Sequence, residues 1–464
     1  MTASWLCSAA RLAAVAALFG AAACSNDSSS VSSGDPATPP PSSSAGSSPR
    51  ALTAADWPTY GHDAARSGYA PSATPLRRLT RAWGATLDGP VYAQPLVIGG
   101  SVLVATENNT LYALDAATGR QRWRTRVAAP VRLSTLPCGN IDPLGITGTP
   151  VYDPATGRIF AVAEVSGPRH VLVGVSLASG HVDVQVPLGP PGGNPGDAQQ
   201  RAALALLGNR VYVAYGGLAG DCGQYIGGVA SLRTDGTGRL GWAVPTTRMG
   251  GIWTPGGPTI RAGSLYVSIG NGAAIEGVYD GSDSITRLSA SLVRRDVFAP
   301  RQWARDNRVD ADLGSMGAAL VGNRVLVAGK SGIGYLLDAG QLGGIGGQLA
   351  AVDLGCRGFG AAAVVGATAY LPCLEGVRQV TVRGSSLVPG WRGPATSNGP
   401  PVVGGGAVWS VNRDSGTVLA LNPATGAVRA SYDVGSVEHF ASPALSRSRV
   451  FVPTATGVVA LRTN

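Results

Sequence analysis

Residues 111–123 read LYALDAATGRQRW and form half of a unit that recurs along the chain. The unit consists of a strand, a tight turn, a second strand that ends in Asp, a Thr-Gly turn, and a strand that ends in Trp. It returns as VLALNPATGAVRASY at residues 418–432, with looser copies between the two. A repeat of about 45 residues built from short strands is typical of a β-propeller. We therefore expect an all-β fold in which each repeat forms one blade of four antiparallel strands.

The number and closure of the blades follow from counting these repeats. Pairs of strands such as those in LVGNRVLVAGK (320–330) are joined by a Gly-Asn turn, which suits a two-residue hairpin. The last repeat ends without the outer strand that RQRW supplies in the first, and LTRAWGATL (79–87) lies ahead of the first repeat. We predict eight blades, with this N-terminal strand completing the last blade and removing its free edge. No stretch of the body has the period of a helix. The eight clusters of strands begin near Gly89, Gly145, Ala202, Gly256, Gly317, Gly360, Gly399 and Ala441.

The N-terminus has the composition of an export signal followed by a tether. Arg11 precedes an apolar run, and small residues then lead into Cys24, as in a secretory signal peptide. A Cys at the cleavage point resembles the bacterial lipoprotein signal, in which that Cys carries the lipid; the alternative is ordinary cleavage that leaves Cys24 free. Residues 24–52 are mostly Ser, Pro, Gly and Ala, which bury too little apolar surface to fold. We expect a signal peptide (1–23), a disordered tether (24–52) and a propeller domain (53–464).

The number of cysteines also indicates a location outside the cytoplasm. Two of the six lie in the predicted signal and anchor, and the remaining four are Cys138, Cys222, Cys356 and Cys373. Four Cys in an exported protein indicate two disulfides, for which three pairings are possible. We favour Cys356–Cys373 within one blade and Cys138–Cys222 between two loops. No C-x-x-C is present and the four His are isolated, so we do not expect a zinc site. The predicted location is outside the cytoplasm, with the lipid anchored at the outer face of the bacterial cell membrane.

The basic residues do not form a nucleic-acid-binding pattern. The formal net charge is +9, but the Arg residues are scattered, and RRD at 294–296 is about the densest cluster. Nucleic-acid binding requires a stripe of basic residues with interleaved aromatic residues. We therefore expect no nucleic-acid partner, and we expect a monomer.

The body resembles the pyrroloquinoline-quinone (PQQ) repeat superfamily, the eight-bladed quinoprotein alcohol dehydrogenase-like propellers. The opening segment DWPTYGHDAARSGYAPS (56–72) is similar to the W-P-x-Y-G-x-D entry segment of that group. The resemblance implies one of two functions. Some members are periplasmic dehydrogenases that hold PQQ and Ca²⁺ at the propeller centre, whereas outer-membrane assembly lipoproteins hold no cofactor and bind proteins. Both functions occur on the same fold, so only the residues of the site can distinguish them.

The resemblance assigns PQQ-binding roles to three residues. PQQ is a flat tricarboxylate that needs an aromatic surface, cations and a divalent ion. Lys330, the only Lys among 36 basic residues, lies in VAGKSGIGYLLD, which resembles the K-x-G-x-x-Y-x-L-D segment whose Lys contacts the quinone. Trp253 and Asn271, 18 residues apart, resemble the stacking Trp and the Ca²⁺-binding Asn, although Gly272 replaces the usual Pro. Alternatively, Lys330 belongs to the blade consensus, Trp253 packs between blades, and Asn271 fills a left-handed turn.

The catalytic and acidic metal-binding positions match less well. Asp310 and Asp312 lie in NRVDADLGS (307–315), which loosely resembles the loop of the catalytic Asp, so either is a candidate base. They are also ordinary turn residues. Asp221 is the nearest match to the acidic Ca²⁺ ligand, where the family has Glu. The adjacent Cys-Cys pair of many family dehydrogenases and a C-x-x-C-H haem motif are both missing from the sequence.

We therefore expect a lipid-anchored platform that binds a small-molecule ligand or a protein partner without turnover. The alternative is a PQQ- and Ca²⁺-dependent alcohol or sugar dehydrogenase. PQQ binding requires that Lys330, Trp253 and Asn271 converge on one central pocket.

Overall fold

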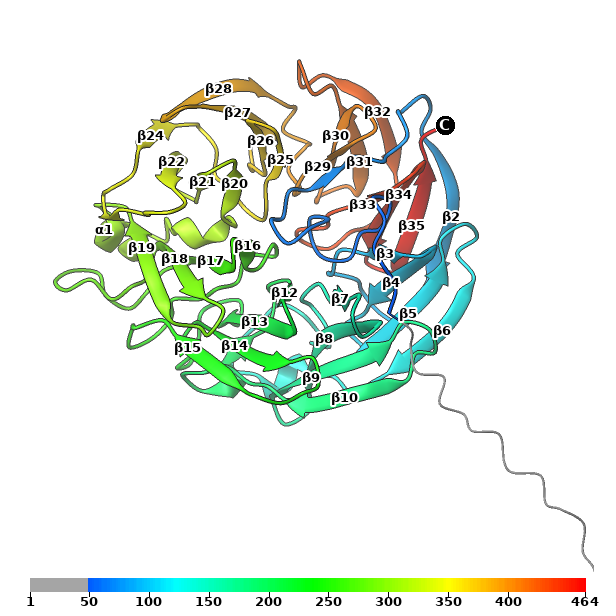
Figure 1. The fold of residues 1–464 in the computed structure, drawn as a ribbon, viewed down its shortest axis with the longest axis horizontal. Helices are drawn as coiled ribbons and strands as arrows, with labels where there is room; N and C mark the ends of the chain where they lie inside the picture. Colours follow the sequence, from blue (N-terminus) through cyan, green and yellow to red (C-terminus); the bar gives the residue numbers. More distant parts are fainter. Residues whose placement is uncertain (1–48) are drawn as a thin grey trace, which may run out of the picture. The chain divides into compact units, whose positions relative to one another are not determined.

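The computed structural model describes residues 49–464, and it confirms the eight-bladed ring (Figure 1). The predicted signal peptide, Cys24 and most of the predicted tether lie outside the described residues. At the domain boundary, the backbone N–H of Arg50 donates to the carbonyl of Pro154 (3.2 Å). Contacts with the propeller therefore begin before the predicted boundary at residue 53. Within residues 49–464, no helix has the length and hydrophobicity needed to cross a bilayer.

Each blade contains four antiparallel strands, numbered from the inner strand outward. The first blade consists of β3 (Leu96–Ile98), β4 (Ser101–Ala105), β5 (Thr110–Asp115) and β6 (Gln121–Arg126). The second consists of β7 (Val151–Asp153), β8 (Arg158–Val165), β9 (Arg169–Ser176) and β10 (Val182–Pro187). The third consists of β12 (Ala205–Leu207), β13 (Arg210–Gly217), β14 (Gly228–Arg233) and β15 (Leu240–Ala243). The fourth consists of β16 (Thr259–Arg261), β17 (Ser264–Ile269), β18 (Ser284–Ser289) and β19 (Arg294–Ala299).

The second half of the ring repeats this order. The fifth blade consists of β20 (Ala319–Val321), β21 (Arg324–Ala328), β22 (Ile333–Asp338) and β24 (Ala350–Asp353). The sixth consists of β25 (Ala363–Val365), β26 (Thr368–Leu371), β27 (Arg378–Arg383) and β28 (Ser386–Arg392). The seventh consists of β29 (Val402–Gly404), β30 (Ala407–Val411), β31 (Thr417–Leu421) and β32 (Val428–Asp433). Short additional strands join three sheets: β1 (Tyr69–Ala70) pairs with β29, β11 (Ala198–Gln199) with β13, and β23 (Gly344–Ile345) with β19.

The eighth blade joins the two ends of the domain, as predicted. It consists of β33 (Ala444–Ser446), β34 (Arg449–Thr454), β35 (Gly457–Arg462) and β2 (Thr80–Thr86). The pairing of β2 with β35 is antiparallel and runs from Thr80 opposite Arg462 to Thr86 opposite Gly457. Figure 1 shows this junction as a blue strand beside a red one. The strand β35 is therefore paired on both of its edges, with β34 and with β2.

The Asp–Thr-Gly–Trp pattern of the repeat is explained by contacts between blades. The Asp115 carboxylate accepts a hydrogen bond from the Thr118 backbone N–H (2.9 Å) and so closes the turn after β5. Gly119 has φ +75°, and a Cβ there would lie 2.7 Å from the ring of Trp83. The Trp83 indole N–H donates to the carbonyl of Ala116 in the same turn (3.1 Å). Each outer-strand Trp of this type docks on the turn of the next blade, and the other two pairs are Trp123 with Leu177 and Trp391 with Pro423.

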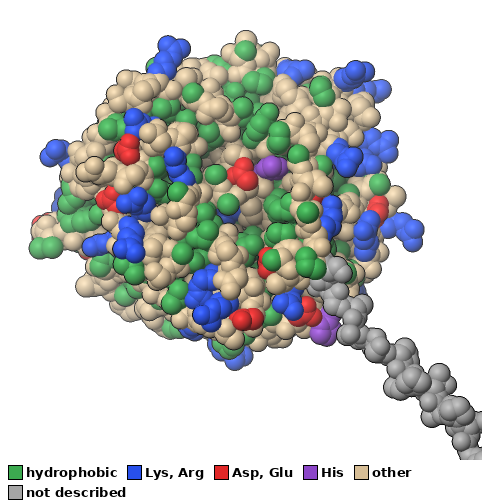
Figure 2. Space-filling model, in the orientation of Figure 1, with side chains coloured by type: hydrophobic (Ala, Val, Ile, Leu, Met, Phe, Trp, Pro, Cys, Tyr) green, Lys and Arg blue, Asp and Glu red, His purple; other side chains and the backbone are tan. Residues whose placement is uncertain are grey.

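The inner and outer strands differ in burial. All five residues of β4 are buried, whereas β6 alternates between exposed and half-buried positions. This difference explains why inner strands are continuous apolar runs and outer strands carry Arg and Thr. The core therefore lies between neighbouring sheets, and the inner ends of the blades are left to form the centre of the ring. On the face drawn in Figure 2, the Lys and Arg side chains are spread over the surface.

The helical content is small but was missed in the sequence. The helix α1 (Trp303–Arg308) and the 3₁₀ turns η1 (Leu133–Thr135), η2 (Pro195–Asp197) and η3 (Leu313–Ser315) all lie in loops. Six residues are fewer than two helical turns, so α1 produces no readable period. It buries one face and leads directly into the loop that carries Asp310 and Asp312.

Both predicted disulfides are present. Cys138 is bonded to Cys222, and Cys356 is bonded to Cys373. The first joins two loops on the pocket side of the ring, and the second joins the segment that enters the sixth blade to the end of β26.

Candidate functional site

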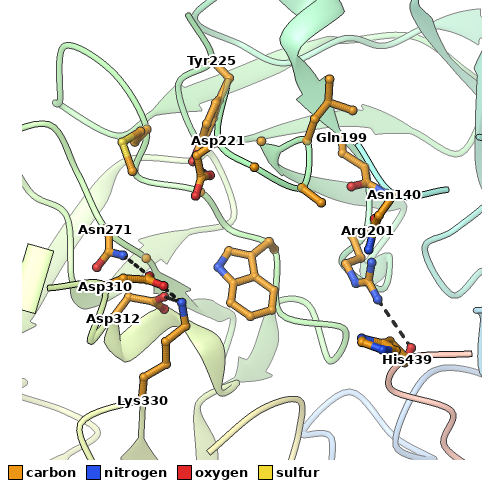
Figure 3. A pocket seen from close by; sticks show the side chains of 18 of the residues that line it. Asn140, Gln199, Arg201, Asp221, Tyr225, Asn271, Asp310, Asp312, Lys330 and His439 are labelled. Carbon is orange, nitrogen blue, oxygen red and sulfur yellow. Dashed lines mark hydrogen bonds and ion pairs between the residues drawn. The ribbon is translucent and has the colours of Figure 1, made fainter. Parts of the chain in front are cut away.

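The candidate residues from four different segments converge on one central pocket (Figure 3). Asp221 follows β13, Trp253 precedes β16, Asn271 follows β17, and Lys330 lies between β21 and β22. The loop after α1 adds Asp310 and Asp312. These loops all leave the blades on the same face, which is why residues separated by more than 100 positions meet. The convergence required for PQQ binding is therefore present.

Lys330 forms one wall of this pocket with three polar side chains. Its ammonium group lies 2.5 Å from Asp310 Oδ1 and 2.8 Å from Asp312 Oδ2. The Asn271 amide donates to Asp310 Oδ1 (2.7 Å). We call these four side chains the Lys330 wall. In Figure 3 they form one hydrogen-bonded group on the same side of the pocket.

Burial and charge act against each other in the Lys330 wall. The Asp312 side chain is 3% exposed and that of Asp310 is 69% exposed. Burial raises the pKa of Asp312, and the Lys330 ammonium opposes this effect. Burial alone would lower the pKa of Lys330, but Asp312 and Asp310 outweigh it, so the pKa of Lys330 is raised. Lys330 therefore stays protonated, and its charge is balanced by neighbouring carboxylates.

Two oxygen atoms of this wall are available to a ligand. Asn271 Oδ1 and Asp312 Oδ1 are buried, and neither has a hydrogen-bond partner within residues 49–464. Buried polar atoms are normally paired, so unpaired ones at a pocket point to an absent partner. Asn271 is not among the described residues with positive φ, whereas Asp310 (φ 55°) and Asp221 (φ 51°) are. The left-handed turn considered for Asn271 is thus wrong.

Trp253 and two phenylalanines supply aromatic surface. The ring centroid of Trp253 lies 6.1 Å from that of Phe440 and 6.4 Å from that of Phe359. The Lys330 ammonium lies 6.0 Å from the Trp253 centroid. Trp253 also packs against backbone, because a Cβ on Gly216 would come within 2.8 Å of it. Trp253 therefore both packs between blades and lines the pocket.

The opposite wall contains Arg201, which the sequence analysis missed. Its guanidinium carbon lies 4.8 Å from the centroid of Phe440 and 5.6 Å from that of Tyr92. Its hydrogen bond to the carbonyl of His439 is long, at 3.5 Å. We call Arg201, Tyr92 and Phe440 the Arg201 wall. Figure 3 shows Arg201 and His439 across the pocket from Lys330. No motif marks Arg201, because its partners come from the first and eighth blades.

Asp221 lies at the lip of the pocket, away from the other acidic residues. Its Oδ1 accepts a hydrogen bond from the Tyr225 hydroxyl (2.6 Å). The adjacent disulfide of Cys222 with Cys138 fixes this loop. Figure 3 shows Asp221 apart from the Asn271–Asp310 pair. In the described part of the chain, no three His, Cys, Asp or Glu side chains are grouped as a metal site.

Comparisons with known proteins give the same fold with two different functions. Residues 80–260 match the family model described as outer membrane protein assembly factor BamB. A quinohemoprotein alcohol dehydrogenase from Pseudomonas putida is 13% identical, with a TM-score of 0.66 over 88% of this chain and 80% of that one. BamB from Moraxella catarrhalis is 14% identical, with a TM-score of 0.57 over 83% of this chain and 97% of that one. A europium-containing methanol dehydrogenase is 14% identical, with a TM-score of 0.62 over 88% and 98%. No curated protein sequence matches the chain. At these identities the likeness shows the fold alone.

Proposed function

We propose that this PQQ-repeat propeller is an extracytoplasmic, lipid-anchored binding platform whose central pocket holds a flat, polycarboxylated ligand without turnover. The convergence of an aromatic surface, Lys330 and Arg201 on one pocket carries the proposal. Small-molecule pockets typically combine apolar surface with a few placed polar groups, as this one does.

The residues fit the organic part of PQQ. Trp253 offers an aromatic face, and cations lie on both sides of it. The free amide oxygen of Asn271 adds an acceptor at the edge of the pocket. When bound, PQQ supplies an electrophilic quinone. The protein side chains would orient it by stacking and by charge-assisted hydrogen bonds to its carboxylates.

The residues do not fit a bound Ca²⁺ ion in this arrangement. Ca²⁺ takes six to eight oxygen ligands, mostly from carboxylates and carbonyls. Here the Lys330 ammonium lies between the Asp310 and Asp312 carboxylates, where a cation would have to compete with it. Asp221 is bound to Tyr225 at the lip. This mismatch is why we favour binding over oxidation.

The proposal also includes a lipid anchor at Cys24 and a protein partner. Two disulfides suit an oxidising compartment outside the cytoplasm. Lipidation at Cys24 would then hold the propeller at the outer face of the cell membrane, with the Ser- and Pro-rich segment as a spacer. The likeness to an assembly factor, BamB, supports a protein partner for the ring surface.

One observation favours a second function, a PQQ- and Ca²⁺-dependent alcohol or sugar dehydrogenase. The Asp310 carboxylate is largely exposed within the pocket and is held by both Asn271 and Lys330. A carboxylate fixed in this way beside a substrate site is suited to accept a hydroxyl proton. Asp312, the other candidate, is the buried carboxylate of the Lys330 wall and is less accessible to a substrate.

Titration of the full-length protein with PQQ, with and without Ca²⁺, tests the proposal. We expect PQQ to quench tryptophan fluorescence with a micromolar dissociation constant. We expect weaker PQQ binding by Trp253→Phe and by Lys330→Ala. We expect no alcohol-dependent dye reduction with PQQ and Ca²⁺ present. Absence of binding would overturn the proposal, and alcohol-dependent dye reduction that is lost in Asp310→Asn would establish the dehydrogenase instead.

A further inference from the structure

Arg201 is held in the pocket by aromatic rings rather than by strong hydrogen bonds. The guanidinium carbon lies 4.8 Å from the Phe440 centroid and 5.6 Å from the Tyr92 centroid, and the hydrogen bond to the His439 carbonyl is 3.5 Å long. Stacking of this kind fixes a guanidinium while leaving its N–H donors free in the plane. Lys330, in contrast, has both neighbouring carboxylates at hydrogen-bond distance. Arg201 is thus the pocket cation with the more available donors.

Glu107 is a buried carboxyl group whose charge acts on Arg201, and its Oε1 has no hydrogen-bond partner among the described residues. Glu107 is 0% exposed, and its Oε2 accepts a hydrogen bond from the Gly145 backbone N–H (2.6 Å). Burial raises the pKa of Glu107 to about 7, against the opposing effects of Gly145, Thr147 and the Arg201 charge. This carboxyl group therefore changes charge near neutral pH, and its charge acts on the guanidinium.

The other ionisable groups that face Arg201 are Tyr92, Glu438 and His439. Burial raises the pKa of Tyr92 well above its usual value, so its hydroxyl is neutral. Glu438, in the loop before β33, faces both Arg201 and Glu107. Burial and the charges of Arg413 and Arg201 lower the pKa of His439, so this imidazole is neutral at pH 7 and above. Glu107 is the buried acid of this group.

We propose that Arg201 is the carboxylate-binding residue of the central pocket, and that Glu107 acts on it as a proton-linked counter-charge. An ionised Glu107 balances the Arg201 charge and weakens the attraction for an anion. When Glu107 is protonated, the Arg201 charge is not balanced and attracts an anionic ligand more strongly. An anionic ligand therefore binds with uptake of a proton from solvent by Glu107, and no other bond is made or broken. This inference rests on the proposed function, because it names the chemistry by which the same pocket selects its ligand.

Isothermal titration calorimetry of the full-length protein tests this inference with two probes, PQQ and trimesate, a flat benzene tricarboxylate without a quinone. Titrations in two buffers of different ionisation enthalpy give the protons taken up per ligand. We expect proton uptake near pH 7. If the bound anion raises the pKa of Glu107 by about one unit, the affinity at about pH 6 should be about tenfold higher than at about pH 8, because one pKa unit corresponds to a tenfold change in the binding constant.

Substitutions separate the two residues. Arg201→Gln should weaken both probes about 10- to 100-fold, as expected for loss of a charge-assisted hydrogen bond, with partial recovery in Arg201→Lys. Glu107→Gln, which keeps the shape but cannot ionise, should bind at pH 8 as wild type binds at pH 6, without proton uptake. Asp306→Asn is the matched control: Asp306 is also a buried carboxyl group with a raised pKa, but the charge that acts on it is that of Arg305 rather than Arg201 or Glu107.

Each remaining outcome has a defined meaning. If the wild type binds neither probe, the proposed function and this inference both fail. If it binds but Arg201→Gln binds equally well, only the inference fails. Proton uptake that persists in Glu107→Gln and disappears in Glu438→Gln would assign the proton to Glu438 and overturn the role of Glu107.

Discussion

The two walls of the central pocket hold their cations in opposite ways. In the Lys330 wall, carboxylates lie 2.5 and 2.8 Å from the ammonium, and the charges compensate one another. In the Arg201 wall, aromatic rings hold the guanidinium, and the nearest buried acid has a pKa of about 7. A further buried acid, Glu164, accepts a hydrogen bond from the backbone N–H of Gln200, the residue before Arg201, and burial raises its pKa to about 8. Carboxylates thus form close ion pairs with the cation on one side, whereas on the other side the buried carboxyl groups accept hydrogen bonds from backbone N–H groups.

This difference teaches that a buried carboxyl group has no fixed effect on stability. Removing one carboxylate of a buried ion pair destabilises the fold, because the charge of its partner is then less well compensated. An unpaired carboxyl group destabilises the fold once the unfolded chain can ionise. Replacing the acid by its amide should therefore act in opposite directions on the two sides of the same pocket.

The largest expected effect lies on the side of the Arg201 wall, in Glu164→Gln. Glu164 Oε1 accepts from the Gln200 backbone N–H (2.7 Å), a bond that an amide oxygen can retain. Its neighbour His170 is kept neutral because burial lowers its pKa to about 4. Between the usual value of 4.5 and about 8, the unfolded chain loses this proton while the folded chain keeps it, so wild-type stability falls as pH rises.

Glu164→Gln should therefore match the wild type near pH 4.5 and become more stable as pH rises, by up to about 5 kcal/mol above pH 8. Urea unfolding at a series of pH values measures the difference. The exposed Glu276→Gln serves as the control and should follow the wild-type curve. Parallel curves for wild type and Glu164→Gln would show that Glu164 is ionised in the folded state.

The next largest effect lies in the Lys330 wall and has the opposite sign. Asp312→Asn removes the buried partner of Lys330 and should destabilise the fold by about 2 kcal/mol. Asp310→Asn is matched in chemistry but exposed to solvent, and it should change stability by less than about 0.5 kcal/mol. Equilibrium unfolding in urea compares the two. Equal effects would contradict the distinction between the buried and the exposed carboxylate.

The fold was predictable because it depends on local, repeated chemistry. The Thr-Gly turn needs glycine at Gly119, and the outer strand needs Trp83 to dock on it, so both requirements recur in the sequence. The missing strand of the last repeat likewise predicted the pairing of β2 with β35. The six-residue helix α1 was missed, because a single short turn leaves no periodic pattern.

The site was predictable on one side only. Lys330, Asn271 and Asp310 lie in segments that resemble family motifs, and the structure brings them together. Arg201 and Glu107 have no such context. Their pairing depends on the distance between the first and third blades, which no single repeat encodes. The sole Lys stood out by composition, whereas Arg201 was one of 35 arginines.

A smaller effect concerns metal binding by the Lys330 wall. Removing the ammonium in Lys330→Gln leaves Asp310, Asp312 and Asn271 Oδ1 without a competing cation. We expect Ca²⁺ to bind this variant about tenfold more tightly than the wild type, a change of about 1.4 kcal/mol. Terbium luminescence sensitised by Trp253, with Ca²⁺ as competitor, reports the affinity. Adding Asp310→Asn should reverse the gain, and unchanged affinity in Lys330→Gln would mean that the ammonium does not occupy the cation position.

The smallest effect tests whether the rings of the Arg201 wall position its cation. Phe440→Leu keeps an apolar side chain but removes the ring 4.8 Å from the guanidinium. A cation–π contact at a partly exposed site contributes about 0.5–1 kcal/mol, so trimesate affinity should fall about two- to fivefold. Phe359→Leu is the matched control, because Phe359 faces Lys330 at 5.9 Å rather than Arg201. Phe440→Leu should lose its effect in an Arg201→Gln background, since the ring acts through the guanidinium. An equal loss in both backgrounds would mean that Phe440 contacts the ligand directly, and the two walls would then differ in charge pairing but not in how aromatic rings support them.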